Sequence, residues 1–136
     1  MSDREPPPGA TASASWIVSE SDLASALSTE HSDSFPPVFA TARMVALMEL
    51  AAARVLTPLL APGELSDGVL VDARHTAATP PGARVTATAR YVGRDGKFYR
   101  FEVEASDDSG PIGRAVHDRA IVTVERLLEG ARKRVG

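Results

Sequence analysis

The chain has no cysteine among its 136 residues. Disulfide bonds, thiolate metal sites and cysteine nucleophiles are therefore excluded. A net charge of −3 gives no electrostatic basis for binding nucleic acid. No apolar run is long enough to span a bilayer, and the polar, proline-rich N-terminus does not resemble a secretory signal. We therefore expect a cytoplasmic protein that binds neither nucleic acid nor membrane.

The length and composition fit one globular domain. The hydrophobic fraction of 43% and the charged fraction of 24% are ordinary for a folded chain of this size. We expect residues 1–10 to form a disordered leader because they are polar and rich in proline. Residues 11–130 are predicted to form the domain, and residues 131–136 a basic tail.

One long helix is predicted ahead of a series of strands. Residues Val38–Leu60 contain no glycine and carry apolar side chains at helical spacing. A strand over Thr11–Ser19 and a short helix capped by Ser21 or Asp22 precede this helix. From Gly68 onward apolar and polar residues alternate, which predicts four strands in a meander. Residues 125–134 are predicted to form a short terminal helix or a frayed tail.

This order of elements predicts an α+β protein. A helix that is apolar on most of its faces must be enclosed, so we expect an antiparallel sheet to wrap around it. The edges of such a sheet favour pairing between subunits. A homodimer, or a larger oligomer, is therefore expected.

Glu49 is the most unusual residue of the long helix. An ionised carboxylate costs several kcal/mol, on the order of the penalty for any buried charge, when it is enclosed without a partner. One interpretation is a structural ion pair with an arginine such as Arg43 or Arg54. The other is a general base, and the sequence alone leaves both interpretations open.

Two further residues are candidates for acid/base chemistry with Glu49. His75 ends a predicted strand, where a histidine is a hydrogen-bonded structural residue or a proton carrier. Thr41 caps the long helix or orients a carboxylate or a water molecule. Because Thr41 and Glu49 are separated by about 12 Å of helical rise, we favour a composite site at a subunit interface. His31 lies in a predicted loop, and His117 lies on a predicted strand, where we expect it to face a partner or solvent. Both are interpreted as residues without a catalytic role.

Gly68 and Arg119 are candidates for substrate contacts. Gly68 is either a turn residue or a backbone N–H offered to a substrate carbonyl. Arg119 either pairs with an acid or meets an anionic ligand. No glycine-rich nucleotide loop, nucleophile elbow or histidine spacing for a metal is present, so no metal site is expected.

Several separated blocks of the sequence resemble the fluoroacetyl-CoA thioesterase family. The resemblance covers roughly residues 35–124 without gaps. The blocks are Phe35-Pro36-x-Val38-Phe39-Ala40-Thr41, Met44-Val45-x-Leu47-Met48-Glu49, Pro62-Gly63-Glu64, Gly68, His75-Thr76-Ala77-Ala78-Thr79-Pro80-Pro81-Gly82, Ile112-Gly113 and His117-x-Arg119-Ala120.

The resemblance implies a hot-dog fold and a homodimeric enzyme that hydrolyses an acyl-CoA without a cofactor. It further implies that Thr41, Glu49 and His75 form the catalytic set. Gly68, His75 and Arg119 would then contact the substrate, and Phe35 would gate the acyl pocket.

Residues 20–37 correspond to a lid and gate in this family, but the part before Phe35, residues 20–34, matches it poorly. The choice of acyl group, short-chain with or without fluorine, is therefore the least transferable property. Two alternatives stay open: a hot-dog hydratase or dehydratase acting on acyl thioesters, and a non-catalytic acyl-CoA-binding module.

Overall fold

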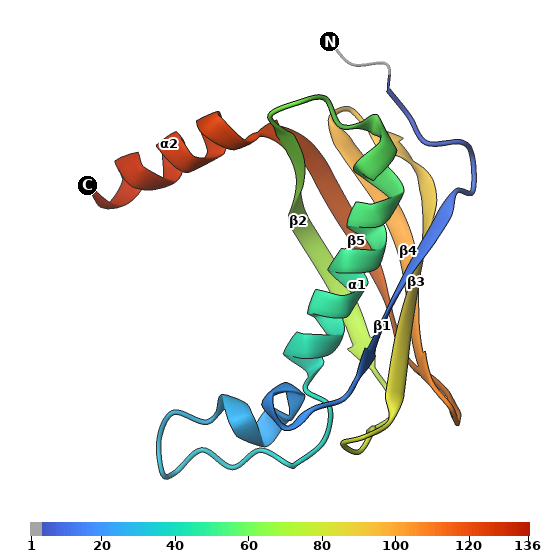
Figure 1. Ribbon diagram of the computed structural model, residues 1–136, viewed down its shortest axis with the longest axis vertical. Coiled ribbons are helices and arrows are strands. Elements are labelled where there is room, and N and C mark those ends of the chain that lie inside the picture. The colour runs from blue at the N-terminus through green and yellow to red at the C-terminus, as the bar shows by residue number, and fades with distance from the viewer. Residues whose placement is uncertain (1–3) are drawn as a thin grey trace.

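The computed structural model describes residues 4–136 and shows a curled antiparallel sheet with one long helix on its concave side (Figure 1). The predicted α+β class, with the sheet around a central helix, is confirmed. In chain order the elements are β1 (Thr11–Ile17), η1 (Glu20–Asp22), η2 (Ala24–Leu27), α1 (Thr41–Leu56), η3 (Thr57–Leu59), β2 (Glu64–His75), β3 (Arg84–Asp95), β4 (Phe98–Asp107), β5 (Gly110–Thr123) and α2 (Val124–Val135).

Helix α1 is shorter than the predicted Val38–Leu60. It begins at Thr41 because the preceding backbone is extended: Phe39 N–H donates to Thr79 O at 2.8 Å, and Ala40 N–H to Asp22 O at 2.9 Å. At its other end Pro58 lacks an N–H, and the chain tightens into η3. Seven side chains of α1 are buried against the sheet: Met44, Leu47, Met48, Ala51, Ala52, Val55 and Leu56.

A glycine on β5 sets how closely the first turns of α1 approach the sheet. A Cβ atom at Gly113 would lie 2.7 Å from Met44 Sδ and 2.6 Å from Arg74 O, and both distances are too short for van der Waals contact. The absent side chain therefore lets α1 pack directly on β5 and β2. This contact fixes the position of Thr41 relative to the end of β2.

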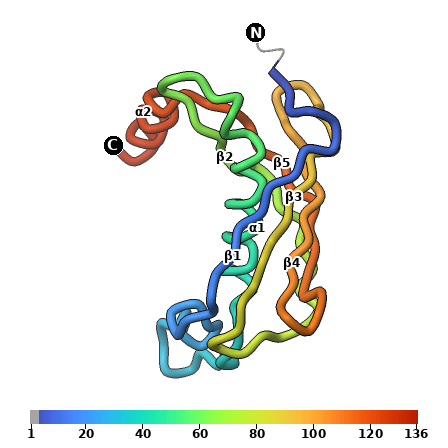
Figure 2. Tube along the Cα trace, turned by 45° about the vertical axis from the view of Figure 1, so that its right-hand side comes forward, coloured from blue at the N-terminus to red at the C-terminus, as the bar shows by residue number. Residues whose placement is uncertain are grey.

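The strand order is β1-β3-β4-β5-β2, so the predicted meander of four strands is wrong. Only β3, β4 and β5 follow one another as neighbours. Strand β2 pairs with β5. Residues 76–83 then lead the chain past β5 and β4 to β3, near the opposite edge of the sheet (Figure 2). Alternating polarity identifies a strand but not its neighbour, which explains the error.

Strand β2 forms one edge of the sheet and is covered poorly within a single chain. Val69, Leu70 and Val71 are 49%, 43% and 36% exposed. Between Gly68 and Leu70 the pairing with β5 shifts at a bulge. An exposed apolar edge of this kind favours pairing with another strand, and the predicted homodimer stays a prediction.

Residues 4–10 contact the domain, so the disordered leader is wrong for that segment. Arg4 forms an ion pair with Glu64, and the Tyr99 hydroxyl donates to Arg4 O at 2.8 Å. The Tyr91 hydroxyl donates to Glu5 at 2.6 Å. These partners are distant in sequence, which is why local composition gave no sign of them. Residues 1–3 of the expected leader lie outside the described residues.

Helix α2 extends away from the sheet beyond the β2 edge (Figure 1). The expected basic tail from residue 131 belongs to this helix, with Arg132, Lys133 and Arg134 in its last turn. Cations are favourable there because the carbonyl groups at a helix C-terminus carry partial negative charge. Within residues 4–136 no helix is long and apolar enough to cross a membrane.

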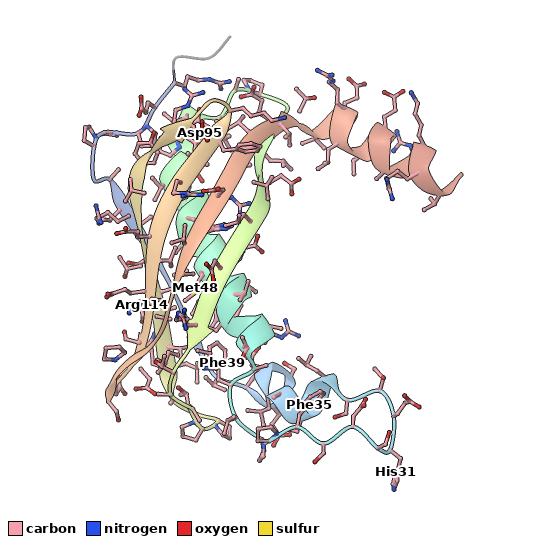
Figure 3. All side chains as sticks on the ribbon, turned by 180° about the vertical axis from the view of Figure 1, so that it is seen from behind. His31, Phe35, Phe39, Met48, Asp95 and Arg114 are labelled. Atoms are coloured by element: carbon pink, nitrogen blue, oxygen red, sulfur yellow. The ribbon has the colours of Figure 1, made fainter. Side chains whose placement is uncertain are left out.

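The predicted lid segment precedes α1 and lies beside its first turn. It contains η1 and η2, and its short helix starts from Ser19, two or three residues before the predicted caps. Leu23 bridges to Phe39, which is 1% exposed. His31 lies in the loop at the far end of this segment and Phe35 lies between it and Phe39 (Figure 3). The limits of the lid and of the domain stay predictions.

Candidate active site

Thr41 and His75 meet where the start of α1 passes the end of β2. Thr41 Oγ1 and His75 Nδ1 are hydrogen-bonded at 2.8 Å. The alternative that Thr41 caps the helix is wrong, because Ala40 is the N-cap residue and Thr41 is the first helical residue. Its hydroxyl is therefore available to orient the imidazole ring.

The environment of His75 keeps its imidazole neutral. Burial lowers the pKa of His75, and a hydrogen bond with the Ala77 backbone raises it by less. Its Nε2 atom is buried and has no hydrogen-bond partner within residues 4–136. Buried polar atoms of native proteins are nearly always paired, so an unpaired one marks a candidate functional atom.

A groove of about 420 Å³ opens beside this pair. Its wall is mostly apolar, and Phe35, 53% exposed, stands at it from the lid segment. The lining residues are Ala24, Phe35, Pro36, Val38, Phe39, Thr41, His75, Thr76, Ala77 and Ala78. Apolar walls with a few polar groups are typical of small-molecule sites. None of these ten lining residues carries a carboxylate.

Glu49 lies in a second cluster, further along α1. Arg119 Nη1 donates to Glu49 Oε2 at 3.4 Å. The expected enclosure of Glu49 is wrong for a single chain, since its side chain is 41% exposed whereas that of Arg119 is 9% exposed. The predicted partners Arg43 and Arg54 instead contact Asp22 and Ser13 O.

Gly68 completes the second cluster. It lies opposite Arg119 in the β2–β5 pairing, at the bulge. A Cβ atom at Gly68 would lie 2.1 Å from Glu49 Oε2 and 3.3 Å from Arg119 Nη1. The carboxylate therefore occupies the space that any other residue's side chain would fill.

Arg119 is held by more residues than the sequence indicated. Its Nε donates to Ser66 Oγ at 2.9 Å and its Nη2 to Ser66 O at 2.9 Å. Its Nη1 lies 3.1 Å from His117 Nε2. Burial lowers the pKa of Arg119, with Glu49 and Asp67 opposing the change. His117 is fully buried, which contradicts the expectation that it faces solvent or a partner.

The six predicted site residues thus fall into two groups within one chain. Thr41, His75 and Phe35 share the groove, and Gly68, Glu49 and Arg119 share the bulge. The two groups are separated by about 12 Å of rise along α1. Among residues 4–136 no three histidine or acidic residues gather into a metal site.

Comparisons with known structures define the class of protein. A solved fluoroacetyl-CoA thioesterase is 36% identical, with a TM-score of 0.87 over 96% of this chain and 98% of that one. A Thermus thermophilus member of the thioesterase superfamily is 32% identical, with a TM-score of 0.85 over 96% of both chains. A hot-dog-like protein from Thermanaerovibrio acidaminovorans is 25% identical, with a TM-score of 0.82 over 96% and 93% of the two chains. The protein is a hot-dog thioester hydrolase.

Sequence comparison gives the family within that class. The profile of the fluoroacetyl-CoA-specific thioesterases matches residues 18–125. The fluoroacetyl-CoA thioesterase of Streptantibioticus cattleyicolor is 43% identical over 100 residues, which are 74% of this chain and 72% of that protein. The chain belongs to the fluoroacetyl-CoA-specific thioesterase family. The predicted resemblance, hot-dog fold and enzyme class are confirmed.

If Glu49 takes part in the reaction, as predicted, Gly68→Ala is expected to lower kcat/KM by about 10²-fold, because displacing a reacting group by an ångström has effects of that order. The new methyl group would push the mobile, partly exposed end of Glu49 away from the bulge. The free energy of unfolding should change by less than about 1 kcal/mol, since alanine suits extended backbone better than glycine.

Steady-state kinetics and urea unfolding of the same preparation measure both effects. Gly130→Ala in α2 is the matched control, because a Cβ there meets nothing within 4 Å. Wild-type kinetics in Gly68→Ala would show that the position of Glu49 does not matter for turnover.

Proposed function

We propose that this thioester hydrolase cleaves a short-chain acyl-CoA to the free acid and CoA. The observation that carries the proposal is the Thr41–His75 pair at a small apolar groove, in a chain that is 43% identical to a fluoroacetyl-CoA thioesterase. Water is the acyl acceptor: a C–O bond forms, the C–S bond breaks, and the proton lost by water ends on the thiolate or the carboxylate product.

Each of the six site residues has a role that fits its contacts. Glu49 activates the attacking water as a general base or attacks the carbonyl itself. His75 carries protons at Nε2, and Thr41 orients its ring through Nδ1. This assignment differs from the expectation that Thr41 orients a carboxylate. The Gly68 N–H stabilises the developing oxyanion.

Substrate selection is assigned to the lid segment and to Arg119. Phe35 is half exposed at the groove, where it can cover a short acyl group and would collide with a long one. Arg119 is a permanent cation close to Glu49 and can hold an anionic or carbonyl oxygen. We assign the choice between fluorinated and other short acyl groups to the lid segment, because Phe35 stands at the groove.

We further propose a homodimer whose active sites combine residues of both subunits. In an antiparallel pair of β2 edges, a two-fold axis near the middle of the exposed run Val69–Asp72 would place His75 opposite the region of Ser66 of the partner subunit. Ser66 belongs to the cluster of Glu49 and Gly68. The two groups that one chain separates would then meet across the interface.

The proposed chemistry needs neither a metal nor an organic cofactor. A thiolate is a good leaving group, so water activation and oxyanion stabilisation suffice. The CoA moiety belongs to the substrate. The cytoplasmic location and the lack of nucleic-acid and membrane partners remain predictions.

Thiol release from a panel of acyl-CoAs tests the function. Acetyl-CoA, fluoroacetyl-CoA, medium-chain and aromatic acyl-CoAs are incubated with wild type, and free CoA is followed with a thiol reagent. We expect hydrolysis of short-chain substrates, with medium-chain and aromatic acyls slower because the groove is small.

The same panel separates the other functions considered for this fold. Loss of an enoyl-CoA without thiol release would show a hydratase. Tight binding without turnover would show an acyl-CoA-binding module. Release only from carrier-protein thioesters would keep the chemistry and change the substrate class.

A further inference from the structure

A buried histidine lies between the strand bulge and Arg119. His117 is 0% exposed and faces the concave side of the sheet from β5. Its ring centroid lies 6.4 Å from that of Phe101 on β4. Apart from the cluster of Arg119 and Glu49, buried apolar side chains dominate this side of the sheet. A polar side chain placed there needs specific partners.

The two partners of His117 fix its protonation state. Nδ1 lies 2.7 Å from Leu70 O, a carbonyl that can only accept a hydrogen bond, so Nδ1 carries the proton. Nε2 lies 3.1 Å from Arg119 Nη1, a group that can only donate, so Nε2 carries none. His117 is therefore neutral and in a single tautomer. The Nε2 lone pair is an acceptor for the guanidinium.

The same nitrogen of Arg119 serves both His117 and Glu49. Nη1 has two hydrogens and two acceptors, His117 Nε2 at 3.1 Å and Glu49 Oε2 at 3.4 Å, so each acceptor can take one hydrogen. The rest of the guanidinium is anchored on Ser66. Fixing one hydrogen of Nη1 on His117 therefore fixes the direction of the other.

The anchor of this chain of hydrogen bonds is the bulge itself. Leu70 is the first residue paired after the register shift, and Gly68 is the last before it. The bulge, His117, Arg119 and Glu49 thus form one connected unit. We propose that neutral His117 is a positioning residue that holds Arg119 in the orientation required by Glu49. This inference rests on the proposed function, in which Glu49 activates water.

Burial and the neighbouring guanidinium of Arg119 keep His117 neutral at ordinary pH. Burial lowers the pKa of His117, and the Leu70 carbonyl opposes this. Arg119 lowers the pKa as well, whereas Glu49 and Asp118 raise it. A proton on Nε2 would point at the Nη1–H of Arg119. The guanidinium would then lose its acceptor on His117. Since the unfolded chain takes up that proton at higher pH, acid weakens both the hold on Arg119 and the fold.

Two substitutions separate positioning from simple structural support. The amide of glutamine places an oxygen where His117 has Nε2, so His117→Gln keeps an acceptor for Arg119. The amide of asparagine reaches only the position of Nδ1, so His117→Asn keeps the bond to Leu70 O and loses the acceptor. Both variants lose the ring and its packing on Phe101. His117→Gln also loses the bond to Leu70 O and His117→Asn the bond to Arg119, so each variant loses one hydrogen bond.

The test compares thiol release by wild type, His117→Gln and His117→Asn, with thermal unfolding of each. We expect His117→Asn to lower kcat on the order of 10- to 100-fold, His117→Gln to stay within a few-fold of wild type, and both to unfold at similar temperatures. In an Arg119→Ala background the step from His to Asn should have no further effect on kcat, because His117 acts through Arg119.

Three outcomes would overturn the inference. Equal kcat in the Gln and Asn variants removes the need for an acceptor at Nε2. A loss of kcat that follows the loss of stability in both variants makes His117 a structural residue only. An undiminished effect of His117→Asn in Arg119→Ala shows that it does not act through the guanidinium. If wild type itself releases no thiol, the proposed function fails first, and this inference fails with it.

Discussion

Glu49→Gln is expected to lower kcat for thioester hydrolysis by about 10²- to 10⁴-fold, the range that a positioned general base contributes. The amide has nearly the same shape as the carboxylate, but it neither accepts the proton of water nor attacks a carbonyl. Its oxygen still accepts from Arg119 Nη1. The loss should therefore appear in turnover and not in folding.

The stability of Glu49→Gln should stay close to that of wild type. The ion pair with Arg119 is long, at 3.4 Å, and the Glu49 side chain is 41% exposed. Ion pairs that are this exposed to solvent contribute about 0–1 kcal/mol to the free energy of unfolding. Urea unfolding followed by circular dichroism measures the difference in stability, and steady-state assays measure kcat on the same protein.

Glu102→Gln provides the control for a lost glutamate–arginine pair. Glu102 pairs with Arg90 on an exposed part of β3 and β4, and its side chain is 59% exposed. That variant should keep wild-type kcat. If Glu49→Gln unfolds while His75→Ala remains fully active, Glu49 is a structural residue and the proposed site is wrong.

Local pattern predicted the elements but not how they are joined. Period-two alternation identified the strands around Val85, Phe101 and Ile112, and the apolar spacing identified α1. Nothing in the sequence of β2 indicates that it pairs with β5. Polar and apolar residues alternate in the same way in β3, which is the other possible neighbour. The contacts of Arg4 and Glu5 were missed for a related reason, since their partners lie far away in sequence.

In the site too, the sequence predicted which residue types matter but not which residues they contact. The sequence singled out Thr41, Glu49 and His75 by chemistry, and the structure supplies the contacts that assign Thr41 to His75 and Glu49 to Arg119. His117 was passed over because a lone histidine on a strand is usually unremarkable. Its spacing of two from Arg119, which puts both side chains on one face, was the signal available.

Combining defective subunits is expected to restore activity if the site is composite. A His75→Ala subunit and a Glu49→Ala subunit are each inactive as homodimers. In a mixed dimer one site receives both defects, and the other receives the intact His75 of one chain and the intact Glu49 of the other. Dimers purified through two different tags should therefore show about half of wild-type activity, because one of two symmetric sites is complete.

For the reverse mixture the opposite result is expected. It also excludes subunit exchange as the explanation for restored activity. A His75→Ala/Glu49→Ala double variant paired with wild type has one defect in each site if the sites are composite, so it should be nearly inactive. If each chain carried a complete site, this dimer would keep half of the activity and the first mixture would have none. The two results together decide whether the separation of Thr41–His75 from Glu49 along α1 is closed by the β2 edge of a second subunit.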